Sequence, residues 1–449
     1  MLGEPITSYK IVKDPVHGYL RIYEHEVPLV DNIVFQRLRR IKQLATAELV
    51  YPGAVHTRFL HSLGTAHVME VFVRELLSKV RVSRSDVERY VVLMRLIALL
   101  HDIGHGPYSH VFEDAVLYPR NTNHEIMGSR IILEHSEVGS VVERIVESYG
   151  YELKDVAKAV AASNIDEWPF RSNIADELNE QALFYLIKGA FSVDIIDYLL
   201  RDSYYTGAGY GMGIDWQRIA HYLYPLGSKI ALDHRAVEVF DQMILARLWM
   251  FSTVYYHKTV RAASKFMEFI LRKLDERASF DEYISSVHRY IELDDYSVLL
   301  KAMEVGVAEI RDFLARTIPF KAIAEHRLSI RREDAGLETL LALSKSYIEE
   351  LLEEELRRRG LDLEKEKHFF VDTPRLPLNP VLGDEELMIR LSDGSIVKRR
   401  VLELTWFDIP KSIAVVRLYI DRRHVEDVEI VKEAFERIVK HGEAVRSFY

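Results

Sequence analysis

Residues 91–110 read VVLMRLIALLHDIGHGPYSH: an apolar run from Val91 to Leu100, the pair His101-Asp102, and a turn that contains two glycines and a proline. Only Arg95 interrupts the run, which is typical of a buried helix. A histidine and an aspartate at the end of such a helix cost free energy unless a partner satisfies them. A divalent cation is such a partner, so this stretch predicts a helical core that ends at a metal site.

Further ligands are expected to be histidines or acids on other apolar elements. His61 lies in RFLHSLG (residues 58–64), and Asp194 lies in FSVDIIDY (residues 191–198). Imidazole and carboxylate ligands together suit Mn, Fe, Ni or Zn, and Mg where carboxylates and water dominate. We therefore predict that His61, His101, Asp102 and Asp194 bind one divalent metal ion, against the alternative that each is a hydrogen-bonded polar residue of the core.

The order of a histidine, a histidine–aspartate pair and a distant aspartate resembles the HD phosphohydrolase superfamily. Within it, several stretches are similar to the branch of deoxynucleoside triphosphate triphosphohydrolases, and they follow one another in the same order over roughly residues 9 to 265. These stretches are DPVHG (14–18), FQRLR (35–39), YPGA (51–54), RFLHSLG (58–64) and HDIGHGPYSH (101–110). The resemblance implies metal-dependent hydrolysis of deoxynucleoside triphosphates to a deoxynucleoside and inorganic triphosphate.

The resemblance also assigns roles to side chains around the predicted metal. Phosphate esters resist cleavage mainly because of their charge, so catalysis needs an activated water, cations on the phosphoryl oxygens and an acid for the leaving oxygen. Imidazoles titrate near neutrality and suit that acid role. By the resemblance, His110 protonates the leaving 5′-oxygen, His124 and Glu125 form a supporting imidazole–acid pair, and Arg58 and His105 hold phosphoryl oxygens. Hydrogen bonds of ordinary turns and caps are the alternative for this group.

Substrate-binding residues are expected on the helix through Asp194, where Tyr198, Arg201 and Asp202 follow at i+4, i+7 and i+8 and form one polar stripe. By the resemblance, Tyr198 and Asp202 contact the sugar, and Asp202 accepts a hydrogen bond from the 3′-hydroxyl. The remaining predicted substrate-binding residues are Gln43 and Leu44 beside the ribose, Tyr255 at the 2′ position and Arg247 at the phosphates. Plain core packing and a surface ion pair are the alternatives.

Two positions depart from the human member of that branch. Ile195 stands where it has a lysine directly after the last metal aspartate, and Phe251 stands where it has a histidine. Both changes remove phosphate or pocket contacts. They leave open a nucleotidase or phosphodiesterase that acts on other nucleotides.

A second nucleotide site is implied for an activator, either a guanine nucleotide or a deoxynucleotide, at a subunit interface. An aspartate and a glutamine can read a base edge, and Lys10 and Arg39 can neutralise phosphate. The matching residues are Lys10, Ile11, Asp31, Gln36 and Arg39. The resemblance further implies a homo-oligomer, as a dimer or tetramer, whereas a solvated charged surface is the alternative.

Composition limits the classes of function. The 449 residues are 48% hydrophobic and 29% charged, which is typical of a globular chain of two or three domains. Zero cysteines exclude disulfides, thiolate catalysis and cysteine-ligated metals. No apolar stretch approaches the ~20 residues of a membrane span, and the first residues lack a signal-peptide pattern, so we expect a cytoplasmic protein. The net charge of −10 argues against the remaining alternative, a non-catalytic nucleotide sensor or single-strand nucleic-acid binder.

The chain is expected to be mostly α: an HD-domain helical core with an N-terminal β-hairpin around residues 14–18, and a small C-terminal α+β lobe. We predict a capping box at Ser85 and Glu88, a helix cap at Asn123 and one helix over residues 180–203. Strands are predicted at residues 387–391, 396–402 and 412–420, before a helix at 425–440. Three segments follow from these patterns: 1–214 as the catalytic core, 215–360 as a helical extension that completes the nucleotide pocket, and 361–449 as the α+β lobe.

Overall fold

The apolar run of residues 91–100 forms the second half of α4 (Arg84–Leu100), where every side chain is at most 2% exposed. Ser83 caps this helix, because its hydroxyl accepts a hydrogen bond from the backbone amide of Asp86 at 3.1 Å. The predicted capping box of Ser85 and Glu88 is therefore wrong, since Ser85 already lies within the first turn. The predicted cap at Asn123 is confirmed: its side chain accepts from the backbone amide of Ile126 at the start of α6 (His124–Glu134).

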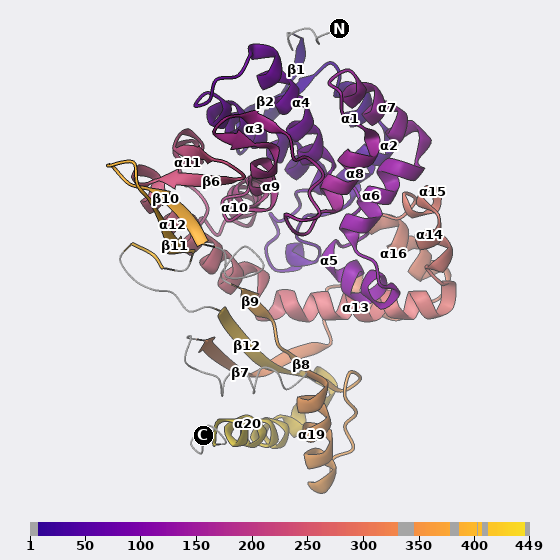
Figure 1. Cartoon of the computed structure of the whole chain (residues 1–449). Coiled ribbons are helices and arrows are strands. Elements are labelled where there is room, and N and C mark those ends of the chain that lie inside the picture. Colours follow the sequence, from indigo (N-terminus) through magenta and orange to yellow (C-terminus); the bar gives the residue numbers. More distant parts are fainter. Residues whose placement is uncertain (1–7, 331–344, 378–385, 402, 406–411, 445–449) are drawn as a thin grey trace.

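Three helices, α3 (Arg58–Leu77), α4 and α10 (Val193–Thr206), pack together in the upper, helical part of the structure in Figure 1. The structure is a computed structural model, and it describes residues 8–330, 345–377, 386–401, 403–405 and 412–444. Here α3 packs along α4, and α10 packs against α3. The predicted mostly helical fold, with an N-terminal hairpin and a C-terminal α+β region, is confirmed.

The helix predicted over residues 180–203 is broken in two. A short α9 (Phe184–Lys188) ends at Gly189, and α10 begins after Ser192, whose hydroxyl accepts from the backbone amide of Ile195. A Cβ at position 189 would lie 2.4 Å from the carbonyl oxygen of Tyr185, so only glycine permits this turn. The break places Asp194 in the first turn of a new helix.

The N-terminal hairpin consists of β1 (Tyr9–Asp14) and β2 (Gly18–Tyr23), with Asp14 opposite Gly18. Gly18 has a φ of +80°, a conformation that glycine adopts without strain. The Asp14 carboxylate accepts hydrogen bonds from the backbone amides of Val16 and His17. The turn is therefore held by a side chain that also faces the protein interior, because Asp14 is 1% exposed.

The segment predicted to be a helical extension also contains three strands, so it is not helical throughout. A sheet of order β11-β10-β6-β5 joins β5 (Leu223–Leu226) and β6 (Lys229–Asp233) to β10 (Glu386–Arg390) and β11 (Ile396–Arg400). β10 runs parallel to β6. The predicted strand 396–402 is thus shorter, and Leu402 lies outside the described residues. Two long helices follow β6: α12 (Val237–Met250) and α13 (Lys258–Ala278).

The C-terminal region is built on a second sheet of order β7-β12-β8, with β9 also paired to β12. Figure 1 shows α13 between the helical core and this sheet, with α19 and α20 on the sheet's far side. These helices cover a separate apolar cluster that includes Leu352, Phe369, Leu418 and Phe435. The elements are β7 (Phe320–Ile330), α19 (Lys345–Arg358), β8 (Phe369–Asp372), β9 (Arg375–Pro377), β12 (Ser412–Asp421) and α20 (Val428–Ala444).

Shorter elements complete the described fold around the helical core. Among the described helices, none has an apolar stretch that would cross a lipid bilayer. The shorter elements are α1 (Val27–Val30), α2 (Ile33–Arg37), α5 (His110–Phe112), α7 (Ser136–Glu147), α8 (Leu153–Ala161), β3 (Asn173–Ala175), β4 (Leu178–Asn179), α11 (Trp216–His221), α14 (Asp281–Ser285), α15 (Val287–Tyr290), α16 (Asp295–Glu304) and α17 (Glu309–Leu314).

Candidate metal centre and active site

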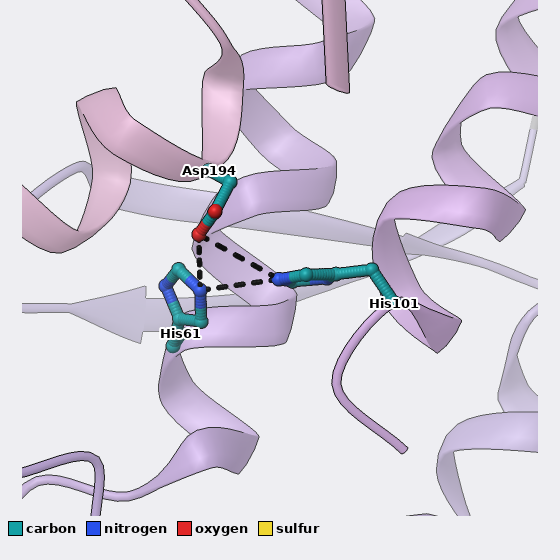
Figure 2. Close-up of side chains that lie close together, drawn as sticks. All are labelled: His61, His101 and Asp194. Atoms are coloured by element: carbon teal, nitrogen blue, oxygen red, sulfur yellow. Dashed lines mark hydrogen bonds and ion pairs between the residues drawn. The ribbon is translucent and has the colours of Figure 1, made fainter. Parts of the chain in front are cut away.

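Figure 2 shows the side chains of His61, His101 and Asp194 converging on one point, and Asp102 lies beside them. His61 lies in the first turn of α3, His101 and Asp102 follow the end of α4, and Asp194 lies in the first turn of α10. The His61 Nε2 lies 3.0 Å from an Asp194 oxygen, 3.3 Å from the His101 Nε2 and 3.7 Å from an Asp102 oxygen. Donors at about 2.1 Å from one metal ion are roughly 3.0–3.4 Å apart. The first two separations lie in this range and the distance to Asp102 is slightly longer, so His61, His101 and Asp194 fit a single ion and Asp102 lies next to it.

The imidazole tautomers also fit a metal. The His61 Nδ1–H donates to an Asp197 oxygen at 2.8 Å, and the His101 Nδ1–H donates to the carbonyl of Ala98 at 2.7 Å. In the neutral form of both rings, the two Nε2 atoms would direct lone pairs at the same point, where a cation can bind. Burial would lower the pKa of His61, but hydrogen bonds to Asp194 and Asp197 raise it to about 10, so the site strongly favours positive charge.

Asp197 anchors this centre to the N-terminal hairpin. Its carboxylate accepts from His61, from the His17 Nε2 at 2.7 Å and from two nitrogens of Arg201 at 2.9 Å. Arg201 donates in turn to Asp14 at 2.8 Å. A Cβ at Gly64 would lie 2.0 Å from an Asp197 oxygen, which explains the glycine of RFLHSLG. Asp197 had no predicted role, although its position three residues after Asp194 on the same helix was a usable signal.

Next to the predicted ligands, Arg58 and His105 both contact Asp102. The Arg58 guanidinium donates to an Asp102 oxygen at 2.7 Å and to the Ser109 hydroxyl at 3.0 Å. The His105 Nε2 lies 3.3 Å from the other Asp102 oxygen. Burial would raise the pKa of the Asp102 carboxyl, but Arg58 and the imidazoles of His101 and His105 hold it well below its usual range. Asp102 is therefore ionised, as a metal ligand must be.

Glu113 joins the two remaining imidazoles of the site. Its carboxylate accepts from the His110 Nδ1 at 2.8 Å and from the His124 Nδ1 at 2.6 Å. The predicted pair of His124 with Glu125 is thus replaced by His124 with Glu113, because Glu125 instead pairs with Lys188. Burial opposes ionisation of Glu113, yet both imidazoles hold its pKa far below the usual range. Glu113 was missed, although it follows His110 by three residues.

Four of the predicted substrate-binding residues form two hydrogen-bonded pairs, Asp202 with Tyr255 and Tyr198 with Arg247. Asp202 accepts from the Tyr255 hydroxyl at 2.5 Å and from the His56 Nε2 at 2.7 Å. Arg247 donates to the Tyr198 hydroxyl at 3.2 Å. Gln43 is 9% exposed, and its side-chain oxygen accepts no hydrogen bond from any residue that the structure describes. Leu44 is half-buried. His56 had no predicted role, although it lies two residues before Arg58.

The predicted activator residues lie at the surface of two separate segments. Lys10 and Ile11 are exposed on β1. The exposed Asp31 caps the C-terminus of α1, and Gln36 lies on α2. The exposed Arg39 donates to the Gln36 side chain at 2.7 Å. These positions are open to a ligand or to a second subunit, and the proposed activator site remains a prediction.

Comparison with protein families matches the HD domain to residues 58–202 and the HD associated region to residues 214–380. The uncharacterized protein YwfO of Bacillus subtilis is 34% identical over 274 residues, which are 61% of this chain and 57% of that protein. The deoxynucleoside triphosphate triphosphohydrolase SAMHD1 of Gallus gallus is 37% identical over 216 residues, 44% of this chain and 34% of that protein. The chain thus spans about half or less of the length of these relatives.

Solved structures with the same fold include a hypothetical protein from Aquifex aeolicus, with a TM-score of 0.71 and 25% identity, which aligns over 94% of this chain and 100% of its own. A phosphohydrolase from Bacteroides thetaiotaomicron aligns over 92% of this chain and 100% of its own, with a TM-score of 0.68 and 24% identity. Residues 58–202 thus match the HD domain, and the chain resembles HD-domain phosphohydrolases, among them deoxynucleoside triphosphate triphosphohydrolases.

Proposed function

We propose that this protein hydrolyses deoxynucleoside triphosphates to deoxynucleosides and inorganic triphosphate. The observation that carries the proposal is the convergence of His61, His101, Asp102 and Asp194 within metal-ligand distance, beside a cation and imidazoles that suit phosphate chemistry. The triphosphohydrolases of Gallus gallus and Homo sapiens among its relatives support the choice of substrate.

These four side chains would hold a divalent ion, which when bound would supply an acidified water and positive charge at the α-phosphate. Arg58, held in place by its hydrogen bond to Asp102, binds a phosphoryl oxygen and neutralises part of the phosphate charge. His110 has a side chain that is 67% exposed, so it reaches the substrate from the mouth of the site. Its Nδ1–H is held by Glu113, which leaves the Nε2 to deliver a proton to the leaving 5′-oxygen.

The proposed sugar contacts follow from the group around Asp202. Tyr198 and Asp202 lie on α10, one and two turns beyond Asp194, so a nucleotide with its α-phosphate at the metal has its sugar beside them. In this arrangement the 3′-hydroxyl donates to Asp202, and the Tyr255 ring fills the space of a 2′-hydroxyl. Gln43 and Leu44 line the other side of the ribose, and Arg247 reaches the phosphates beyond Tyr198.

The direct test incubates the purified protein with each of the four deoxynucleoside triphosphates and Mn, Mg, Fe, Ni or Zn, and separates the products by chromatography. Release of intact triphosphate shows attack at the α-phosphorus. His101→Ala and Asp194→Ala are expected to lose metal and activity together. Full turnover by either variant would exclude the proposed centre.

Two observations favour a second candidate, a nucleotidase or phosphodiesterase for other nucleotides. Ile195 is 6% exposed and contributes no charge at the phosphates. Phe251 packs its ring against Tyr255, with centroids 4.7 Å apart, where a histidine would offer a polar contact. Release of orthophosphate, or cleavage of mono- or cyclic nucleotides in preference to triphosphates, would favour this candidate.

We also propose the nucleotide activator at Lys10, Ile11, Asp31, Gln36 and Arg39 and a dimeric or tetrameric assembly. Support comes from the exposure of Lys10, Ile11 and Arg39. Native mass measured with and without GTP or a deoxynucleoside triphosphate tests both proposals. A mass that never exceeds one chain, with activity insensitive to added nucleotide, would reject them.

A further inference from the structure

The loop between His105 and His110 adopts a strained backbone. Tyr108 has a φ of +55°, and Ser109 has a φ of +52° with a ψ of −121°, conformations that side chains with a Cβ rarely adopt. Neither residue is glycine, so surrounding contacts must hold the loop in place. The loop lies between two imidazoles of the site and contributes the Ser109 hydroxyl that binds Arg58.

The contact that holds Tyr108 comes from the HD associated region. Asp295, the first residue of α16, is 1% exposed. One of its carboxylate oxygens accepts from the backbone amide of Tyr108 at 2.6 Å, and the other accepts from the backbone amide of Lys42 at 3.0 Å. Lys42 is next to Gln43, and its carbonyl accepts from the Ser109 hydroxyl at 2.9 Å. Asp295 thus joins the catalytic loop to the segment that lines the proposed sugar site.

Neighbouring residues extend the same anchor. The Tyr290 hydroxyl at the end of α15 donates to the carbonyl of Gly104 at 2.8 Å. Arg37 donates to the carbonyl of His105 at 2.7 Å and to that of Leu293 at 2.6 Å. Three carbonyl or amide groups of residues 104–108 are therefore bound, directly or through Arg37, by residues 290–295. Of these contacts, only the one from Asp295 reaches the strained part of the loop.

We propose that Asp295 is a positioning residue, which holds the strained 106–109 loop so that Arg58, His105 and His110 keep their places around the phosphate. The effect of Asp295 on catalysis rests on the proposed function, whereas its anchoring of the loop does not depend on that function. It gives the HD associated region a direct part in building the active site of the HD domain.

The substitutions Asp295→Ala and Asp295→Asn test this role against Asp294→Ala. Asp294 caps α16 and pairs with Arg40, whereas the backbone amides of Tyr108 and Lys42 donate to Asp295. Asp295→Ala removes both acceptors. Asp295→Asn keeps the volume and one acceptor, so it remains useful if the alanine variant fails to fold. Asp294→Ala weakens the same helix and controls for a merely structural effect.

The first readout is hydrogen exchange of the Tyr108 amide, which needs no substrate. We expect exchange at least about tenfold faster in both Asp295 variants, with Asp294→Ala unchanged. The second is steady-state kinetics at saturating metal, where kcat should fall about 10- to 100-fold with KM and bound metal within twofold of wild type. The proposal would be overturned if the Tyr108 amide stayed protected and kcat stayed undiminished in both Asp295 variants, or if Asp294→Ala showed equal losses. If the wild type is inert on all four deoxynucleoside triphosphates while exchange still depends on Asp295, the proposed function fails and the anchoring stands.

Discussion

Replacing Asp197 with asparagine should weaken metal binding although Asp197 is not a proposed ligand. Its carboxylate accepts the Nδ1–H of His61 and so keeps the Nε2 lone pair directed at the metal. An amide of the same size has one acceptor oxygen where the carboxylate offers two, yet four nitrogen donors from His17, His61 and Arg201 surround it. Losing such an outer carboxylate typically costs 10- to 100-fold in metal affinity, or about 1.4–2.8 kcal/mol.

The assay is a competition titration of the metal-free protein with a fluorescent chelator, for example with Mn or Zn. Circular dichroism must show that the Asp197→Asn variant is folded, because Arg201 keeps only Asp14 as a full partner. Glu70→Gln is the matched control: Glu70 is a buried carboxylate on the same helix as His61, but it pairs with Arg95 at 3.0 Å, away from the metal centre. A dissociation constant within twofold of wild type in folded Asp197→Asn would refute the reasoning, as would an equal loss in Glu70→Gln.

Three further outcomes are expected. Glu113→Gln should lower kcat about 100-fold with metal affinity unchanged, because an amide cannot hold both His110 and His124 in their present orientation; steady-state kinetics with metal analysis checks this. Burial, with a contribution from nearby His17, lowers the pKa of His67 to about 4. As the pH falls below 6.5, His67 therefore takes up a proton in the unfolded chain but not in the folded one. The free energy of unfolding should fall by up to about 3 kcal/mol by pH 4. Urea unfolding at several pH values should show a shallower dependence in His67→Gln. Stripping the metal with a chelator should lower the melting temperature in calorimetry, because a bound ion stabilises only the folded chain, and the His101→Ala variant should not respond.

Two of the predicted metal ligands, His101 and Asp102, could be recognised from one short stretch of sequence. A histidine–aspartate pair at the end of an apolar run that only Arg95 interrupts indicates a ligand pair, and the resemblance supplied His61 and Asp194 from distant stretches. The supporting residues were harder to foresee. His17, Asp197 and Glu113 act through contacts that span up to 180 residues or through a choice between neighbouring acids, which spacing alone does not decide. Glu113 rather than Glu125 binds His124, because Lys188 from another helix takes Glu125.

In the fold, too, local features could be predicted from the sequence, whereas features set by tertiary contacts could not. The buried helix at residues 91–100 and the hairpin at 14–18 follow from hydrophobic pattern and turn chemistry. The strands β5 and β6 have only four and five residues, and their partner β10 comes more than 150 residues later, so no local pattern revealed them. The break at Gly189 depends on a close approach to the Tyr185 carbonyl, which is a tertiary constraint.

The parallel pairing of β10 with β6 has a practical meaning for anyone who shortens this chain. Ending it near residue 360 would remove β10 and β11 and strip one side of β6 of its hydrogen-bond partners. The same cut would remove β12, the strand that pairs with β7, together with β8 on the other side of β12. Unpaired strands of this kind recruit other chains, so a truncated version should be prone to aggregation. The residues after 360 therefore complete two sheets whose other strands come from earlier in the chain.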